Sequence, residues 1–289
     1  ATSLSGATSG MSYAIDGSYN TSDGYRDNGD TNGGDLGASL TVTPHQRLNI
    51  FVSAGLHSDV TGLPGELKES DLATGVLRRS TLKPGEFAEV DDVYVIARPR
   101  ILLGDSALAQ VDFSFRKRDA AFFSSFAGGT FNGNTTIETF TISPQINVSN
   151  PVGQLSNTLV VGVDASRSAE NILNTTAFGE RETVGMFRLK KQNTAFYLHD
   201  ELFPHSRLGV SGGYRYDAVD YHFQPSRPAG THFDQHLATV GINFNITGAT
   251  HLYASTAKSF RYPLLDELFN FFSNTIDTTL RPQRSNSYE

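Results

Sequence analysis

The 289-residue chain carries a net charge of −7 and contains no cysteine. The missing cysteines exclude a disulfide framework, a thiolate metal site and a cysteine nucleophile, and the acidic balance argues against a general nucleic-acid binder. No apolar run approaches the roughly 18 residues of a membrane helix. The first ten residues are small and polar and do not resemble a signal peptide, so we interpret the chain as a mature protein or, preferably, as a fragment.

Apolar residues recur at every second position from end to end, which is the period of a β-strand with one covered face. Each such stretch has about the length of a tilted membrane strand, roughly 9–11 residues. In chain order, the predicted strands lie near residues 11–20, 36–43, 48–56, 93–103, 107–115, 140–148, 159–165, 196–198, 208–216, 238–246 and 253–260.

The connections between these strands alternate between short and long. This regularity is typical of bacterial outer-membrane barrels, which have tight turns at one end and long loops at the other. A soluble sandwich buries alternating faces too, but its Greek-key connections give no such two-length pattern. Tight turns are predicted at 44–47, 104–106, 204–206 and 247–250, a shorter connection at 149–156, and long loops at 21–35, 58–87, 117–136, 167–193, 218–235 and 262–284.

Two C-terminal segments resemble a known family. Residues 251–268, HLYASTAKSFRYPLLDEL, and residues 280–289, LRPQRSNSYE, are similar to consecutive barrel segments of TonB-dependent receptors. Tyr262 and Gln283 stand where the family pattern has Ala and Glu, and the rest of the pattern is kept. Weaker similarity lies in 195–201, AFYLHDE, and 213–217, GYRYD.

The resemblance implies an all-β, antiparallel up-and-down transmembrane β-barrel in the outer membrane of a Gram-negative bacterium. Such receptors enclose a plug domain in a barrel of about 22 strands. Because the sequence shows about a dozen strands and no plug, we expect residues 1–289 to be a barrel segment that lacks the plug and the C-terminal strands. Bare sheet edges are costly in lipid, so its first strand (11–20) and its last (253–260, or one that begins at Tyr288) are predicted to be unpaired edges.

The function that the resemblance implies is active uptake of a scarce, bulky nutrient, most commonly a ferric siderophore. The expected partners are the cargo, the TonB complex acting through the plug, and outer-membrane lipid or lipopolysaccharide. No cofactor is expected, and no catalytic motif points to an enzyme. Two alternatives remain: a passive channel or autotransporter-type barrel, and a soluble β-rich binding module.

Aromatic and histidine side chains in the predicted loops are the candidate ligand contacts. Clustered aromatics suit a ligand platform, an interfacial girdle or loop packing. Histidines that flank one loop could contact a ligand or metal together, although none has the spacing of a helical metal site. The candidates are Phe122, Phe123, Phe126, Phe271, His222 and His232, with His236 beside them.

Charged residues within the predicted strands fall on the polar parity. Charge on a lipid-facing position costs several kcal/mol near the midplane, so these side chains are predicted to face the lumen, where they support the barrel or contact cargo or plug. The lumen-facing set is Arg98, Arg100, Asp112 and Arg215. Asp266 and Glu267, next to Arg261, are interpreted as structural residues at the entry to a loop.

Overall fold

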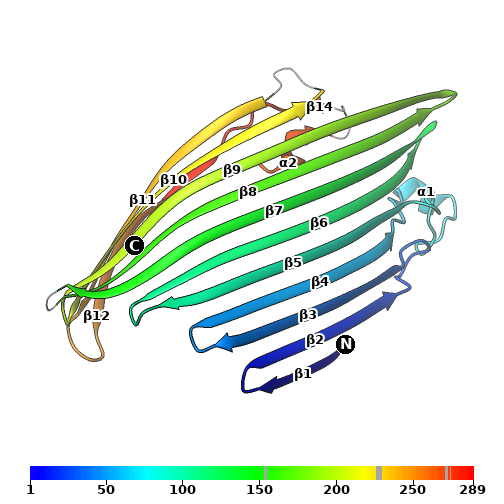
Figure 1. Cartoon of the computed structure of the whole chain (residues 1–289). Helices are drawn as coiled ribbons and strands as arrows, with labels where there is room; N and C mark the ends of the chain where they lie inside the picture. Colours follow the sequence, from blue (N-terminus) through cyan, green and yellow to red (C-terminus); the bar gives the residue numbers. More distant parts are fainter. Residues whose placement is uncertain (153–154, 226–229, 271–272, 274) are drawn as a thin grey trace.

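The computed structural model describes residues 1–152, 155–225, 230–270, 273 and 275–289. Its main feature is one antiparallel sheet of 13 strands in which sequence neighbours are also spatial neighbours, in the order β1 to β12 and then β15 (Figure 1). The predicted all-β, up-and-down architecture is therefore confirmed. Neither of the short helices in the described residues is long or apolar enough to cross a membrane.

The strand bounds show how far hydrogen bonding extends along each hairpin. The strands are β1 (Thr2–Thr8), β2 (Met11–Ser22), β3 (Thr31–His45), β4 (Leu48–Gly62), β5 (Phe87–Leu103), β6 (Ala107–Phe126), β7 (Gly129–Val152), β8 (Leu155–Phe178), β9 (Arg181–His205), β10 (Leu208–Gln224), β11 (Gly230–Asn245), β12 (His251–Arg261), β13 (Phe269–Asn270), β14 (Thr275–Ile276) and β15 (Gln283–Tyr288); the helices are α1 (Glu69–Ala73) and α2 (Leu265–Leu268).

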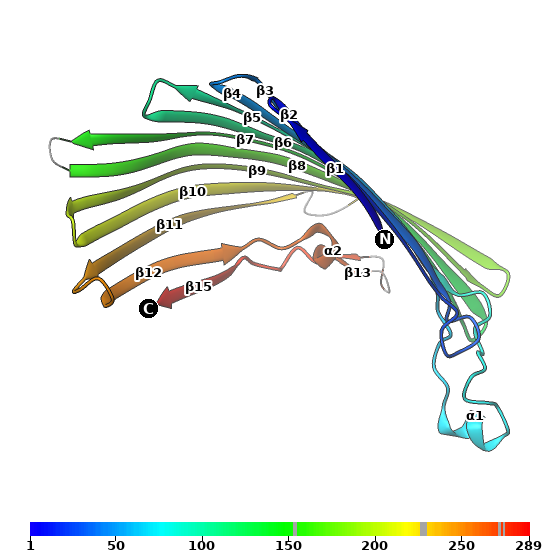
Figure 2. The same cartoon turned by 90° about the horizontal axis from the view of Figure 1, so that it is seen from below.

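The sheet is curved into an open trough. Figure 2 shows α2 and β13 lying on its concave side, below the arch of the long central strands. Within the described residues, β1 and β15 are the two edges of the sheet. The predicted first edge was therefore wrong, because residues 2–8 form an additional strand that pairs with β2 from Gly17 to Met11. At the other edge, β15 begins at Gln283, ahead of the predicted start, and pairs with β12.

The predicted tight turns all lie at one end of the sheet, called here the turn end. Strict antiparallel order places the β3–β4, β5–β6, β9–β10 and β11–β12 connections together. The opposite end, the loop end, carries the β4–β5 connection with α1 and the β12–β15 connection with α2. This arrangement confirms the predicted grouping of the tight turns at one end, with the long β4–β5 and β12–β15 connections at the other.

Two of the predicted long loops are wrong. Residues 117–136 and 167–193 continue the β6–β7 and β8–β9 hairpins, which pair as far as Phe126↔Gly129 and Phe178↔Arg181. Gly128 (φ 83°) and Gly179 (φ 60°) supply the left-handed backbone that such tight turns need. The loops predicted at 21–35 and 218–235 are also shorter, because pairing reaches Ser22↔Thr31 and His222↔Gly230.

The convex face carries an apolar band next to the turn end. On β8 the convex positions from Leu159 to Ala165 are all apolar, and on β6 so are those from Val111 to Phe115. Val163 and Val240 are 38% and 55% exposed, so no second layer covers the band. The first convex charges beyond it are Lys117 and Arg167. A band of this kind, bounded by charge, is what a lipid-facing barrel wall requires.

Candidate functional site on the concave face

One row of side chains crosses the concave face from β10 to β4. On β10, Arg215 shares a face with Tyr221, whose hydroxyl donates to the Pro263 carbonyl oxygen (2.7 Å) in the segment that lies on the concave side. Residues that are directly paired on neighbouring strands lie on the same face of the sheet. The row can therefore be followed from β10 to β4 through these pairs. The row is Arg215, Tyr197, Gly162, Gln145, Gln110, Arg100 and Asn49.

Three of the four predicted lumen-facing residues meet on β5 and β6 of this face. Arg98 forms an ion pair with Asp112. The Arg100 Nε donates to the Gln110 side-chain oxygen at 2.7 Å, and the Gln110 amide donates to Asp112 at 2.6 Å. These contacts join two guanidinium groups and one carboxylate into a single network. A lumen-facing role for them stays a prediction that this geometry favours.

The fourth residue, Arg215, lies between two carboxylates. Its guanidinium contacts Asp164 at 2.5 Å and Asp217 at 2.8 Å. It also lies 5.6 Å from the ring centroid of Tyr197, within cation–π range. Asp217 is only 2% exposed, and its other side-chain oxygen accepts a hydrogen bond from the Asn193 amide.

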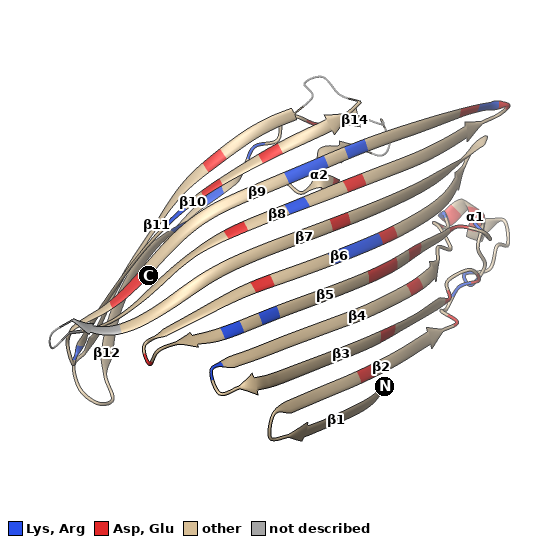
Figure 3. Ribbon diagram, in the orientation of Figure 1, with Lys and Arg blue, Asp and Glu red and all other residues tan. Residues whose placement is uncertain are grey.

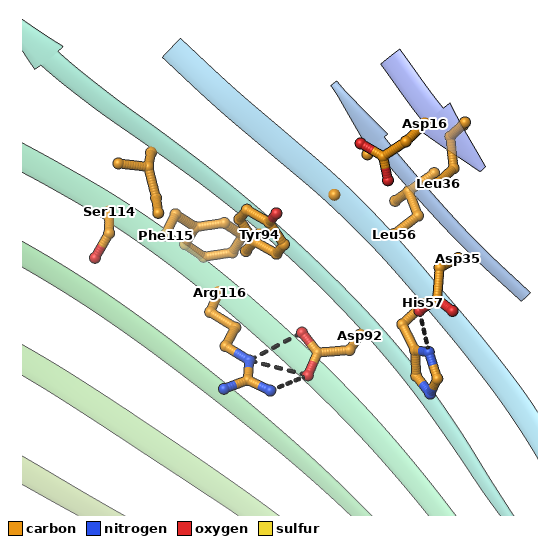
Figure 4. Close-up of a pocket in the computed structure, with 13 residues that line it drawn as sticks. Asp16, Asp35, Leu36, Leu56, His57, Asp92, Tyr94, Ser114, Phe115 and Arg116 are labelled. Carbon is orange, nitrogen blue, oxygen red and sulfur yellow. Dashed lines mark hydrogen bonds and ion pairs between the residues drawn. The ribbon is translucent and has the colours of Figure 1, made fainter. Parts of the chain in front are cut away.

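A second polar cluster lines a cavity of about 670 Å³ over β2–β6. His57 lies between two carboxylates, 2.7 Å from Asp35 and 2.8 Å from Asp59. Arg116 donates from Nε to both oxygens of Asp92 at 2.9 Å. Figure 4 shows Asp35, His57, Asp92 and Arg116 around the same hollow. The sequence analysis did not single out His57 or Asp92, although strand parity alone would have placed both on the polar face.

An apolar cavity of about 880 Å³ lies at the loop end, beyond the polar row. Phe122, Phe126 and Phe131 line it. Phe123 alternates to the convex face and stacks on Phe87 at a centroid distance of 6.2 Å. The predicted aromatic set is therefore divided between two faces of the hairpin, and Phe271 lies outside the described residues.

The described residues of the segment 262–277 (262–270, 273 and 275–277), called here the capping segment, pack on the concave ends of β8–β10. Its Tyr262, Leu265 and Leu268 join a buried cluster with Val219 and Tyr221. The Tyr262 hydroxyl donates to the Asp217 carbonyl oxygen at 3.0 Å. The cluster fixes this segment against the wall of the sheet.

Glu267 closes the first turn of the capping segment. Its carboxylate accepts from the Leu264 backbone nitrogen at 2.9 Å and pairs with Arg261. These hydrogen bonds hold the pKa of Glu267 below its usual value. The contacts agree with the structural interpretation of Asp266 and Glu267.

The candidate histidines do not share the concave face. His222 and His232 alternate with the concave residues Tyr221 and Phe233, so both lie on the convex face. His232 contacts Asp220 at 2.8 Å, and His236 contacts the Tyr214 hydroxyl at 2.7 Å. Among the described residues, no group of three or more histidines and carboxylates could hold a metal. Their ligand role stays a prediction.

A family model, "TonB dependent receptor-like, beta-barrel", matches residues 3–289. This chain belongs to the TonB-dependent receptor β-barrel family. The family consists of outer-membrane transporters and not enzymes, which confirms the predicted location and the expectation that the chain is not an enzyme. No curated protein matches the sequence.

Solved receptor structures share this fold. The chain is similar to the unliganded ferric citrate transporter FecA (TM-score 0.82, 12% identity, 99% of this chain and 44% of that chain). It also resembles the siderophore receptor PiuA from Acinetobacter baumannii (0.74, 14%, 96% and 50%) and the copper transporter OprC (0.68, 14%, 96% and 46%). The chain thus spans about half the length of these structures. Because their named cargoes differ, the shared fold does not select a cargo.

Proposed function

We propose that this chain is part of the wall of a TonB-dependent receptor that actively imports a scarce, bulky nutrient, with a ferric siderophore as the leading cargo class. In the complete receptor, a plug outside residues 1–289 would couple transport to the TonB complex. The proposal rests on family membership and on the siderophore and ferric-complex receptors among the similar structures. Family membership removes the soluble-module alternative.

The observation that carries the proposal is the order of surfaces along the concave face. An aromatic cavity at the loop end is followed, toward the turn end, by rows of charged groups that are already paired with one another. A large cargo with an organic shell can be held by the aromatic groups. Paired charges beyond them offer hydrogen bonds without one strong trapping site, which suits passage and not retention.

Cargo uptake by cells that express the complete receptor tests this proposal. We expect accumulation of a labelled ferric siderophore from a panel that also includes ferric citrate, haem, cobalamin and a copper complex. Accumulation should stop when TonB is deleted or the proton gradient is collapsed. Uptake of a non-siderophore cargo would correct the cargo class alone. Uptake that persists without TonB would favour the passive-channel alternative and overturn the proposal.

A further inference from the structure

The long connection between β4 and β5 is closed at its base by two side chains from another loop. Arg26 and Asn28 belong to the turn between β2 and β3. The Arg26 guanidinium donates to the carbonyl oxygen of Pro64 at 3.1 Å and to that of Ser80 at 2.9 Å. Because Pro64 lies near the start of the connection and Ser80 near its end, one guanidinium holds the two ends together. Figure 3 shows basic and acidic residues gathered in the loops at this corner of the sheet, around α1.

Asn28 forms a second bridge of the same kind. Its side-chain amide nitrogen donates to three backbone carbonyl oxygens, those of Leu63 (3.1 Å), Lys83 (2.8 Å) and Glu86 (2.9 Å). Its backbone is left-handed (φ 59°), a conformation that asparagine adopts more readily than most residues. The bridged residues, 63–65 and 80–86, are called here the neck. Figure 2 shows the rest of the connection, with α1, projecting away from the sheet.

The neck is also joined to the tip of β6. Glu86 is 6% exposed, and its carboxylate accepts from the Ser125 backbone nitrogen at 2.6 Å and from the Ser125 hydroxyl at 2.8 Å. Lys83 pairs with Glu86 at 2.9 Å and also donates to the Ser125 carbonyl oxygen. The pairing of β5 with β6 ends at Phe87↔Phe123. The neck therefore supplies hydrogen-bond partners to β6 beyond the point where β5 can do so.

Ser125 lies beside the apolar cavity at the loop end. The residues on either side of it, Ser124 and Phe126, line that cavity together with Phe122. A contact that fixes Ser125 therefore also fixes the backbone that carries these lining side chains. An unbroken series of contacts runs from the β2–β3 turn, through the neck, to the wall of the cavity.

We infer that Arg26 and Asn28 are positioning residues for cargo binding, which act through the neck on the aromatic wall of the cavity. The inference rests on the proposed function, since it takes this cavity as the cargo site. Without the two bridges, Glu86 and Lys83 lose their fixed position and the tip of β6 loses its support. The cargo must then order that tip when it binds, which lowers its affinity. Residues remote from a ligand change affinity about 2- to 30-fold through such networks.

A spin label on the cavity wall tests the positioning without any cargo. Residues 1–289 contain no other cysteine, so Ser124→Cys provides one attachment point in the complete receptor. Ser114→Cys provides a control position on the same face of β6, farther from the tip. In detergent, we expect R26Q and N28A to raise the mobility of the label at position 124 and to leave the label at position 114 unchanged.

The matched control is R79Q. Arg79 is an exposed arginine of the same connection, and its side chain lies 3.9 Å from Asp27 without bridging the neck. We expect R79Q to leave the label at position 124 as mobile as it is in the unaltered receptor. Heat-modifiable gel mobility checks that each variant is folded.

Cargo affinity is the second readout, with a ferric trihydroxamate and a ferric triscatecholate siderophore as probes. R26Q should weaken binding of the siderophore that the receptor accepts about fivefold, and R79Q should not change it. In an F122A receptor, R26Q should cause less than about a twofold further loss, because two changes that act through one wall are not additive. A purely structural role for Arg26 predicts independent, additive losses.

Three results would overturn the inference: an unchanged label at position 124 in R26Q, equal effects of R26Q and R79Q, or additive losses in R26Q and F122A. Binding of neither siderophore would instead count against the proposed cargo class, and the label at position 124 would still decide the positioning. If R26Q does not fold, N28A gives the same test, since it removes one amide only. An unchanged label in N28A would then refute the inference.

Discussion

Phe122 and Phe123 are sequence neighbours whose side chains point to opposite faces of β6. Phe122 lines the loop-end cavity, whereas Phe123 stacks on Phe87. We expect Phe122→Ala in the complete receptor to weaken cargo binding about tenfold or more, because an aromatic ring that a ligand buries contributes about 1.5–3 kcal/mol. Phe123→Ala is the matched control and should leave cargo affinity unchanged. Equal losses in a binding titration of both variants would contradict the assignment of the cavity.

Arg215 and Arg98 are both paired on the concave face, but their partners differ in burial. Removing Arg215 leaves the almost fully buried Asp217 without its cation. We expect Arg215→Gln to lower the free energy of unfolding by about 3 kcal/mol. Arg98 and Asp112 are each about a third exposed, so Arg98→Gln should cost about 1 kcal/mol or less. Urea unfolding of the complete receptor in detergent measures both values, and the reverse order would refute this explanation.

Glu170 is a buried carboxyl beneath the capping segment. Its side chain is 0% exposed, and both oxygens lack a hydrogen-bond partner among the described residues. Because an unsatisfied buried polar group costs about 1–3 kcal/mol, Glu170→Leu should raise stability by about that amount. Glu170→Gln should not, since the amide also needs partners. The same urea titration distinguishes them, and destabilisation by leucine would show that this carboxyl has a partner in the complete receptor.

At the scale of elements, the capping segment is the one whose docking should respond to pH. The pKa of Glu267 is lowered by the Leu264 backbone hydrogen bond and by Arg261. A depressed pKa means that the ionised form stabilises the docked state. That contribution is present above the unfolded-state pKa of about 4.3 and is lost as the pH falls through the folded value.

We therefore expect the capping segment to loosen from the wall below a pH of about 4.3, as Glu267 takes up its proton. A fluorophore on Leu264→Cys can report it, since residues 1–289 contain no other cysteine. In Glu267→Gln the segment should already be looser at neutral pH and should not respond further as the pH falls from 6 to 3. A Glu267→Gln variant with the same acid response would assign that response to another group.

The long hairpins of β7, β8 and β9 are the elements that the sequence analysis predicted least well. Strands of 24, 24 and 25 residues extend for about 80 Å at roughly 3.3 Å per residue, well beyond an apolar band of about 25 Å. The parts of these strands beyond the apolar band do not face lipid, so polar and apolar residues do not alternate along them. The period-two pattern of β8 therefore ends at Arg167, although its hydrogen bonding to the neighbouring strands continues. Only pairing with the neighbouring strand shows that the hairpin goes on.

At the scale of the whole molecule, the sheet of residues 1–289 has two open edges, β1 and β15. Unpaired backbone groups in lipid cost several kcal/mol each, and bare edges template aggregation in water. We expect the isolated polypeptide refolded in detergent to show no heat-modifiable barrel mobility and no cargo binding. Co-refolding with the remaining segments of the receptor should restore both. A closed, transporting monomer of residues 1–289 alone would show a complete small channel.

The sequence by itself determined the faces of the sheet, the turn end and the family. Strand side chains alternate with a period of two, so a charge such as Arg98 or Asp112 on the polar parity already belongs to one face. The motif at residues 251–268 identifies the family because it is one continuous stretch of sequence. The order of residues along a strand and the loop that follows it is enough to recognise the motif. Both kinds of information are local and need no knowledge of the neighbouring strands.

Only the tertiary structure decided which residues meet. His57 meets Asp35 because the register of β3 and β4 pairs them, and Arg215 reaches Asp164 across an intervening strand. The capping segment contacts Tyr221 because the chain folds back onto the concave wall after β12. Register and curvature are set by pairing between segments that are distant in sequence. The alternation of residues along one strand gives no information about either of them.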